Sequence, residues 1–268
     1  MLYHLAENVV RKQEKQRVYW WEPKNKKPNI GDHVAYDLVN RVLAQKGKLI
    51  SDKLDSSKKL VSVGSVLHFA NTGDAIWGTG LNKKIDDDKN RFRSLDVRAV
   101  RGPKTKAYLN NRGIDVPDVF GDPAILLPFF YPKALMEGQV QKRPYIVINH
   151  MNDEMAQYKG HESELVTPMQ YPGSFIEAIV NSEFVISSSL HGVIIAEAYG
   201  VPAVFLDSNS GESMFKYEDY FGGTNRSSVP KVTSVDEGLS VVRQTPPDLS
   251  AQAVRLYQAF PFDLWGTK

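Results

Sequence analysis

The chain has 268 residues, 42% of them hydrophobic and 24% charged, a composition typical of a folded protein with one large domain or two of ordinary size. Its 33 Lys and Arg residues against 31 Asp and Glu residues leave a formal charge of +2, too small an excess for a typical nucleic-acid-binding surface. The lack of cysteine excludes disulfides, zinc–cysteine sites, iron–sulfur clusters and thiol nucleophiles.

Hydropathy gives no sign of a membrane span, because no apolar run approaches the roughly 18 residues that a transmembrane helix needs. Charged residues interrupt residues 1–21, where a secretory signal would need an unbroken apolar core. We therefore expect a cytoplasmic protein without a transmembrane segment.

Short β-rich runs alternate with helical stretches in the first half, which is typical of parallel βα units. The helices begin or end at recognisable signals: Gly47 follows one, and another begins with Pro103 and is followed by Gly113. We expect strands at 17–21, 60–66, 97–100 and 116–120, and helices at 32–45 and 103–112.

A segment rich in proline and polar residues, 129–144, separates this array from a second one. Its composition suits a linker better than a regular element. The sequence therefore predicts two domains, residues 1–130 and 131–268.

The second half repeats the βα alternation with short joints. A loop with three glycines and several aromatic residues is expected at 208–228, and loops of this length are often functional. A last helix at 249–260 is expected to pack back on the first domain. The remaining expected elements are strands at 145–149, 184–187 and 203–207 and helices at 173–181 and 191–199.

The strongest local signal is Ser-Ser-Ser-Leu-His-Gly at 187–192, where a strand ends and a helix begins. Ligands of open parallel sheets bind at such carboxyl ends. The hydroxyls of Ser188 and Ser189 and the backbone at Gly192 could form an anion site, to which His191 adds a switchable charge. A capping serine is the simpler alternative. We favour the anion site, because a positive group at a helix N-terminus is better tolerated beside an anion.

A matching strand–loop–helix joint in the first half carries Asn-Ile-Gly-Asp at 29–32. Asn29 or Asp32 could cap the helix while Gly31 permits a turn, which would explain the motif without a ligand. The same joint is also where a sugar or phosphate would contact the first domain. Both interpretations stay open.

Other strand ends add polar side chains to the same edge. Arg101 lies between a strand and a proline-started helix, where its planar guanidinium could hold a carboxylate or phosphate; a surface ion pair is the alternative. His68 and Asp122 follow two further strands and are candidates only because several strand ends converge there.

Several common chemistries lack support. The segment Gly-Thr-Gly at 78–80 is not a dinucleotide fingerprint, and neither a P-loop lysine nor a histidine pair of the zinc-protease type occurs. Ser189 and His191 lack the elbow motif of a serine hydrolase.

Taken together, the motifs resemble those of the polysaccharide pyruvyl transferase family over about three quarters of the chain. Their order and spacing carry the resemblance more than any one of them. They lie at 29–32, 100–103, 121–123, 187–192, 196–202 and 216–221.

The resemblance implies an α/β, GT-B-like fold in which two Rossmann-like domains with parallel sheets face a cleft. It also implies phosphoenolpyruvate as the donor and co-substrate and a sugar hydroxyl pair of a glycan as the acceptor, with Arg101 and His191 acting on the donor. The chain departs from many members at Ser189, where they have arginine, and Lys216 or another cation is a candidate substitute.

Ketal formation from an enolpyruvyl donor needs an acid, a base and an anion cradle, and no metal or other cofactor. We assign the anion to Arg101 and Ser188 with the start of the His191 helix. His191 or His68 is the candidate acid, and Asp32 or Asp122 the candidate base. A lipid-linked acceptor would bring the protein to the inner face of the membrane.

Two alternatives remain open at the level of sequence. One is a nucleotide-sugar-dependent glycosyltransferase on the same scaffold, with Glu197 binding a ribose. The other is an inactive carbohydrate-binding homologue, for which the missing arginine before Leu190 is the best support. Fold alone does not separate such functions.

Overall fold

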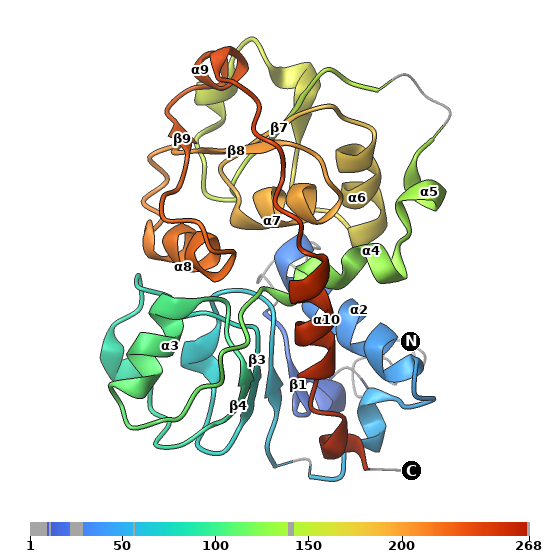
Figure 1. Ribbon diagram of the computed structural model, residues 1–268, viewed down its shortest axis with the longest axis vertical. Coiled ribbons are helices and arrows are strands. Elements are labelled where there is room, and N and C mark those ends of the chain that lie inside the picture. Colours follow the sequence, from blue (N-terminus) through green and yellow to red (C-terminus); the bar gives the residue numbers. More distant parts are fainter. Residues whose placement is uncertain (1–9, 11, 22–28, 56, 139–141, 267–268) are drawn as a thin grey trace, which may run out of the picture.

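The computed structural model describes residues 10, 12–21, 29–55, 57–138 and 142–266. In this part of the chain, two parallel sheets with helices packed around them form an α/β fold (Figure 1). The predicted α/β class with two parallel sheets is therefore confirmed.

The first sheet has the strand order β1-β2-β3-β4. Its strands are β1 (Val18–Tyr19), β2 (Leu60–Val61), β3 (Ala75–Trp77) and β4 (Asp96–Ala99). The sequence predicts β1, β2 and β4 but not β3, which is followed at once by Gly78. The predicted strand at 116–120 is wrong: within the described residues that stretch forms a single bridge, from Phe120 to Val100. Pro117 cannot donate a ladder hydrogen bond there.

The second sheet has the order β6-β5-β7-β8-β9. The predicted strands correspond to β5 (Ile146–Ile148), β7 (Val185–Ser187) and β8 (Ala203–Leu206). The edge strands β6 (Leu165–Val166) and β9 (Lys231–Val232) are not predicted by the sequence.

The helix α2 (Ile30–Ala44) shows why these elements form where they do. Its apolar side chains recur at helical spacing and bury one face completely. Its core residues are Val34, Leu38, Val39, Val42 and Leu43. The other helices are α3 (Pro103–Asn110), α4 (Leu127–Phe130), α5 (Lys133–Met136), α6 (Pro172–Val180), α7 (Leu190–Ala198), α8 (Phe215–Gly223), α9 (Val235–Ser240) and α10 (Ser250–Gln258).

Two expectations about irregular segments are wrong. The expected linker at 129–144 contains α5, and the expected loop at 208–228 contains α8. Glycines at the end of α8 suggested a loop, but Gly223 serves close packing: a Cβ there would lie 2.6 Å from the carbonyl oxygen of Arg101. The buried Tyr217 and Tyr220 form the inner face of this helix.

Elements of the second half pack directly on the first. Figure 1 shows α8 next to α3 and the C-terminal α10 beside the first sheet. The indole of Trp77 in β3 donates to the carbonyl of Leu256 in α10 at 2.9 Å. The backbone N–H of Ile30, at the start of α2, donates to the carbonyl of Pro168 at 2.8 Å. These contacts hold the strand-end loops of both sheets against one another.

In the described part of the chain, none of the helices combines the length and apolar character needed to cross a membrane.

Candidate functional site

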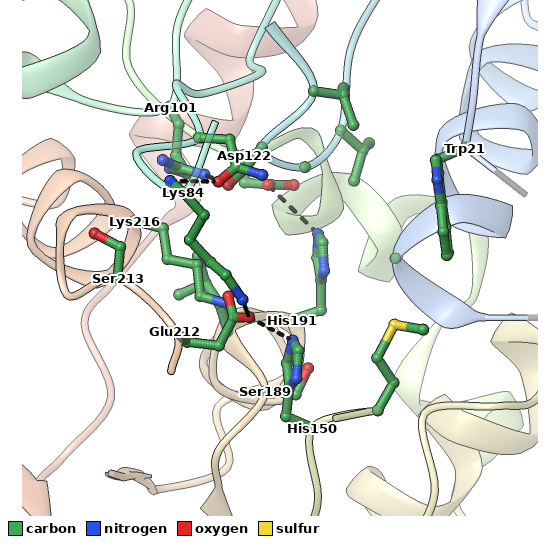
Figure 2. A pocket seen from close by; sticks show the side chains of 18 of the residues that line it. Trp21, Lys84, Arg101, Asp122, His150, Ser189, His191, Glu212, Ser213 and Lys216 are labelled. Atoms are coloured by element: carbon green, nitrogen blue, oxygen red, sulfur yellow. Dashed lines mark hydrogen bonds and ion pairs between the residues drawn. The ribbon is translucent and has the colours of Figure 1, made fainter. Parts of the chain in front are cut away.

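A pocket of about 530 Å³ lies where loops after the strands of both sheets meet (Figure 2), a size typical of small-ligand sites. Both halves of the chain contribute to its wall. The predicted residues that line it are Asn29, Gly31, His68, Arg101, Asp122, Ser189, His191 and Lys216.

Three predicted residues lie outside this wall as far as the chain is described: Ser188, Gly192 and Glu197. Gly192 packs α7 on β7, since a Cβ there would lie 2.2 Å from the hydroxyl of Ser187. Glu197 accepts two hydrogen bonds from Arg226, at 2.6 and 2.8 Å. Asp32 belongs to the first turn of α2, and its side chain lies outside what the structure describes.

His191 occupies the centre of the pocket, at the second residue of α7. Its Nε2 lies 3.6 Å from the Asp122 carboxylate, and 16% of its side chain is exposed. The other side of the ring faces the start of α2, where a Cβ on Gly31 would lie 2.7 Å from Nδ1. Asn29 caps that helix by accepting from the N–H of Gly31 at 3.0 Å. Gly31 is therefore needed for the imidazole to fit, beyond any role in a turn.

Asp122 is buried behind His191 and caps a short 3-10 helix by accepting from the N–H of Ala124 at 3.0 Å. Burial alone would raise its pKa, but the attraction of His191, the Ala124 hydrogen bond and the charge of Arg101 outweigh burial and lower the pKa below 3.8. Asp122 Oδ2 and His191 Nε2 are both buried, and neither has a hydrogen-bond partner among the described residues. The pair can therefore tighten or accept a ligand group.

Arg101 forms part of the pocket wall and is fully buried, so the alternative of a surface ion pair is wrong. Its Nε donates to Asp219 of α8 at 3.1 Å, and one terminal nitrogen donates to the hydroxyl of Ser65 at 2.6 Å. A Cβ on Gly80 would lie 2.2 Å from the guanidinium carbon. The guanidinium is thus held in one orientation, and its partner Ser65 also lines the cavity.

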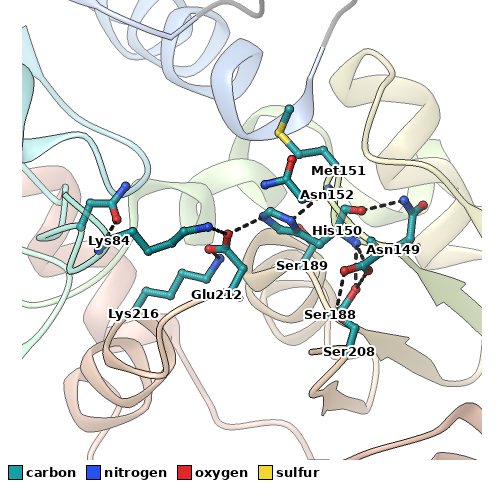
Figure 3. Close-up of polar contacts among 12 residues, drawn as sticks. Lys84, Asn149, His150, Met151, Asn152, Ser188, Ser189, Ser208, Glu212 and Lys216 are labelled. Atoms are coloured by element: carbon teal, nitrogen blue, oxygen red, sulfur yellow. Dashed lines mark hydrogen bonds and ion pairs between the residues drawn. The ribbon is translucent and has the colours of Figure 1, made fainter. Parts of the chain in front are cut away.

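A charged cluster forms another side of the pocket (Figures 2 and 3). The carboxylate of Glu212 accepts from Lys84 at 2.7 Å and from Lys216 at 2.6 Å, and His150 Nε2 lies 3.8 Å from it. Burial would raise the pKa of Glu212, but the two ammonium groups lower it to about 2. Burial lowers the pKa of Lys216, against the attraction of Glu212.

Ser188 supports this side of the pocket from below. Its hydroxyl bonds to the carboxylate of Asp153 and accepts from the backbone N–H of His150 at 2.7 Å (Figure 3). Asp153 also accepts from Ser208 at 2.6 Å. Burial and the charge of Lys216 lower the pKa of His150, which favours its neutral imidazole.

His68 is less suited to proton donation than His191. Burial lowers its pKa, so it is mainly neutral near pH 7, and its ring packs on Phe69 with centroids 4.1 Å apart. Its buried Nδ1 has no hydrogen-bond partner in the described part of the chain.

The sequence analysis missed Lys84, His150, Asp153 and Glu212. His150 could have been found, since it follows β5 at the same sheet edge as the predicted residues. No local sequence pattern marks Lys84 or Glu212 as a site residue. The two residues are 128 positions apart in the sequence, and only the fold brings their loops together.

Basic side chains outnumber acidic ones around the pocket. Lys83, Lys84, Arg101 and Lys216 line it, against the acidic Asp122 and Glu212. Among the residues described, no three His, Cys, Asp or Glu side chains come close enough together to hold a metal ion. Arg101 and Lys216 are mostly buried, whereas the side chains of Lys83 and Lys84 are 40% and 39% exposed. Cations around a small cavity favour a compact, multiply charged ligand.

Comparison with known proteins identifies the family. The family model described as polysaccharide pyruvyl transferase matches residues 29–210, well over half of the chain. This chain belongs to the polysaccharide pyruvyl transferase family. The family resemblance of its motifs is thereby confirmed.

Two curated relatives are similar to this chain. The succinoglycan biosynthesis protein ExoV of Rhizobium meliloti (strain 1021) is 26% identical over 211 residues, which cover 75% of this chain and 63% of ExoV. An uncharacterized protein of Acanthamoeba polyphaga mimivirus is 27% identical over 191 residues, 66% of this chain and 65% of that protein. The matches thus span somewhat less than two thirds of each relative.

The matched family segment contains His191, Asp122, Arg101 and Lys84, and it ends just before Glu212. Lys216 also lies beyond it. The pocket therefore combines residues of the matched segment with residues that follow it.

Proposed function

We propose that this protein is a pyruvyl transferase that forms a pyruvate ketal on a sugar of a polysaccharide or oligosaccharide, using phosphoenolpyruvate and releasing phosphate. The observation that carries the proposal is the position of His191, backed by Asp122 at 3.6 Å inside a cation-lined pocket. Membership of the polysaccharide pyruvyl transferase family supports the same reaction. We also propose that the two parallel sheets correspond to the two domains of a GT-B-like fold.

In the proposed reaction, His191 in its protonated form donates a proton to the methylene carbon of the donor. One sugar hydroxyl then bonds to the neighbouring carbon and loses its proton, for which Asp32 remains the candidate base. The bond from that carbon to the phosphate oxygen breaks, and the second hydroxyl closes the ketal. Of the two hydroxyl protons, one replaces the proton supplied by His191 and the other leaves on phosphate.

Asp122 is the partner that keeps His191 ready for this step. A buried carboxylate with a lowered pKa is ionised at neutral pH, so the His191 ring faces a negative charge. Arg101 acts less directly than the sequence suggested. It orients Ser65 toward the cavity, and its charge lies at the wall where the donor's negative groups would collect.

The nucleotide-sugar alternative is less well supported, because the residue expected to bind the ribose is occupied elsewhere. Glu197 is almost fully buried, pairs with Arg226 through both oxygens and accepts from the hydroxyl of Tyr220 at 2.7 Å. No described part of this ion pair lines the pocket.

The test is to incubate the full chain with phosphoenolpyruvate and a panel of oligosaccharides and to measure phosphate release together with the mass gain of one pyruvate ketal. His191→Asn should lower kcat by about 100-fold or more, as expected for loss of a general acid. His161→Asn is the matched control, since His161 bonds to Tyr145 away from the pocket. Turnover with nucleotide sugars and none with phosphoenolpyruvate would reject the proposal.

A further inference from the structure

Lys84, Glu212 and Lys216 form a compact charged cluster that the proposed reaction has not yet used. Lys84 belongs to a loop after β3, whereas Glu212 and Lys216 lie just before and within the first turn of α8. Only 14% of the Lys216 side chain and 14% of the Glu212 side chain are exposed. All three residues line the pocket that contains His191.

This cluster holds more positive than negative charges. Two ammonium groups share a single carboxylate, at 2.7 and 2.6 Å, which leaves one positive charge uncompensated. Burial lowers the pKa of the nearby His150, so its neutral imidazole adds no further positive charge. A buried ammonium is costly without a counter-ion, so Glu212 is well placed to neutralise Lys216 in the absence of ligand. A dianion would neutralise both lysines more completely than Glu212 does.

The start of α8 also favours an anion between the two lysines. Ser213 and Lys216 both line the cavity there, and the N-terminus of a helix carries a partial positive charge. A group bound between Lys84 and Lys216 would therefore meet two ammonium groups and a favourable helix end. The observed position of the Glu212 carboxylate shows that an anionic group fits between the lysines.

We propose that Lys84 and Lys216 bind the phosphate group of the donor, and that the Glu212 carboxylate occupies this phosphate site in the free protein and is displaced when the donor binds. This inference rests on the proposed function for the identity of the donor. It assigns Glu212 the role of an internal competitor rather than that of a catalytic residue.

Isothermal titration calorimetry of the full chain with inorganic phosphate tests the site without requiring turnover. Glu212→Gln keeps the shape and removes the charge, so it should strengthen phosphate binding about three- to tenfold. Lys216→Met should weaken it about tenfold or more, because a charge-assisted hydrogen bond is lost.

The Lys104–Glu218 ion pair supplies matched controls. It joins α3 and α8 as the Lys84–Glu212 pair joins two loops, but its side chains are nearly half exposed and neither lines this pocket. Glu218→Gln and Lys104→Met change the same charges and should leave phosphate affinity within about twofold of the unchanged protein.

Two further ligands identify which group binds. Phosphoenolpyruvate, like phosphate, should bind Glu212→Gln more tightly and Lys216→Met more weakly than the unchanged protein. Pyruvate, which lacks the phosphate, should bind Lys216→Met and the unchanged protein equally well. Unchanged or weaker phosphate binding in Glu212→Gln would overturn the role of Glu212 as a competitor. An equal loss of pyruvate binding in Lys216→Met would overturn the phosphate assignment.

These outcomes are separable from the proposed function. If phosphate affinities shift as expected but no glycan gains pyruvate, the anion site stands and the pyruvyl transfer fails. If pyruvyl transfer depends on His191 but Glu212→Gln leaves phosphate binding unchanged, only the present inference fails.

Discussion

The ion pair between Arg101 and Asp219 offers a sharp test of how the two halves are held together. Both side chains are fully buried, and Asp219 also accepts from the backbone N–H of Thr105 at 2.9 Å and from its hydroxyl at 2.6 Å. Asp219→Ala would leave the guanidinium and two donors of Thr105 without this carboxylate. Removing one partner of a buried ion pair typically costs about 3–5 kcal/mol in the free energy of unfolding.

This loss should be measured by urea denaturation and by thermal unfolding. The corresponding decrease in Tm is roughly 6–20 °C, at about 2–4 °C per kcal/mol for a chain of this size class. Asp118→Ala is the control, because Asp118 pairs with Lys106 with 83% of its side chain exposed, and it should change stability by less than about 1 kcal/mol. If the free energies of unfolding of Asp219→Ala and Asp118→Ala differ by less than about 1 kcal/mol, the Arg101–Asp219 pair does not secure α8 to α3.

Three further predictions concern the pocket and its surroundings. Gly31→Ala should lower kcat at least about tenfold, because the added methyl group would push the His191 ring. Gly173→Ala is the control, since a methyl group on this helix would meet open space and should leave kcat unchanged. The kcat of both variants is measured, and thermal unfolding shows that both are folded. The pKa of Asp122 is depressed, so its ionised form stabilises the fold above about pH 4 and this contribution is lost as the pH falls; Asp122→Asn should show a flatter dependence of stability on pH below 4, measured by urea unfolding. Glu197→Gln should lower the free energy of unfolding by about 1–3 kcal/mol with unchanged affinity for phosphoenolpyruvate, since Glu197 lies outside the pocket wall as described.

The parts of the site that follow local rules could be predicted from sequence. A strand followed by a helix places His191 at the edge of the second sheet, and the same rule brings Arg101 to the edge of the first sheet, facing the pocket. Asp122 also reaches the pocket, although the strand expected before it is only a bridge. The rule states which edge a side chain occupies, but not which neighbour it meets. The burial of Arg101 against Asp219 could not be predicted, because α8 was expected to be a loop.

The misjudged segments share a physical cause. Gly222 and Gly223 end α8 where its backbone approaches Pro103 and Arg101, and a sequence pattern does not distinguish a glycine chosen for close packing from one chosen for a turn. Likewise β6 and β9 are strands only because β5 and β8 pair with them. Their assignment depends on tertiary contacts, which override weak local preferences.

Three polar contacts at and behind the pocket wall join one half of the chain to the other. His191 meets Asp122, Glu212 meets Lys84, and Asp219 meets Arg101, with the first residue of each pair following β7 and the second preceding β5. In each half alone, His191, Asp122 and the Arg101–Asp219 pair would lack these partners, and unpaired charges are costly when buried. Lys216, by contrast, has its acidic partner Glu212 in its own half. It follows that the proposed proton donation by His191 and the proposed anion binding by Lys84 and Lys216 depend on the same packing of α8 and α10 against the first half of the chain.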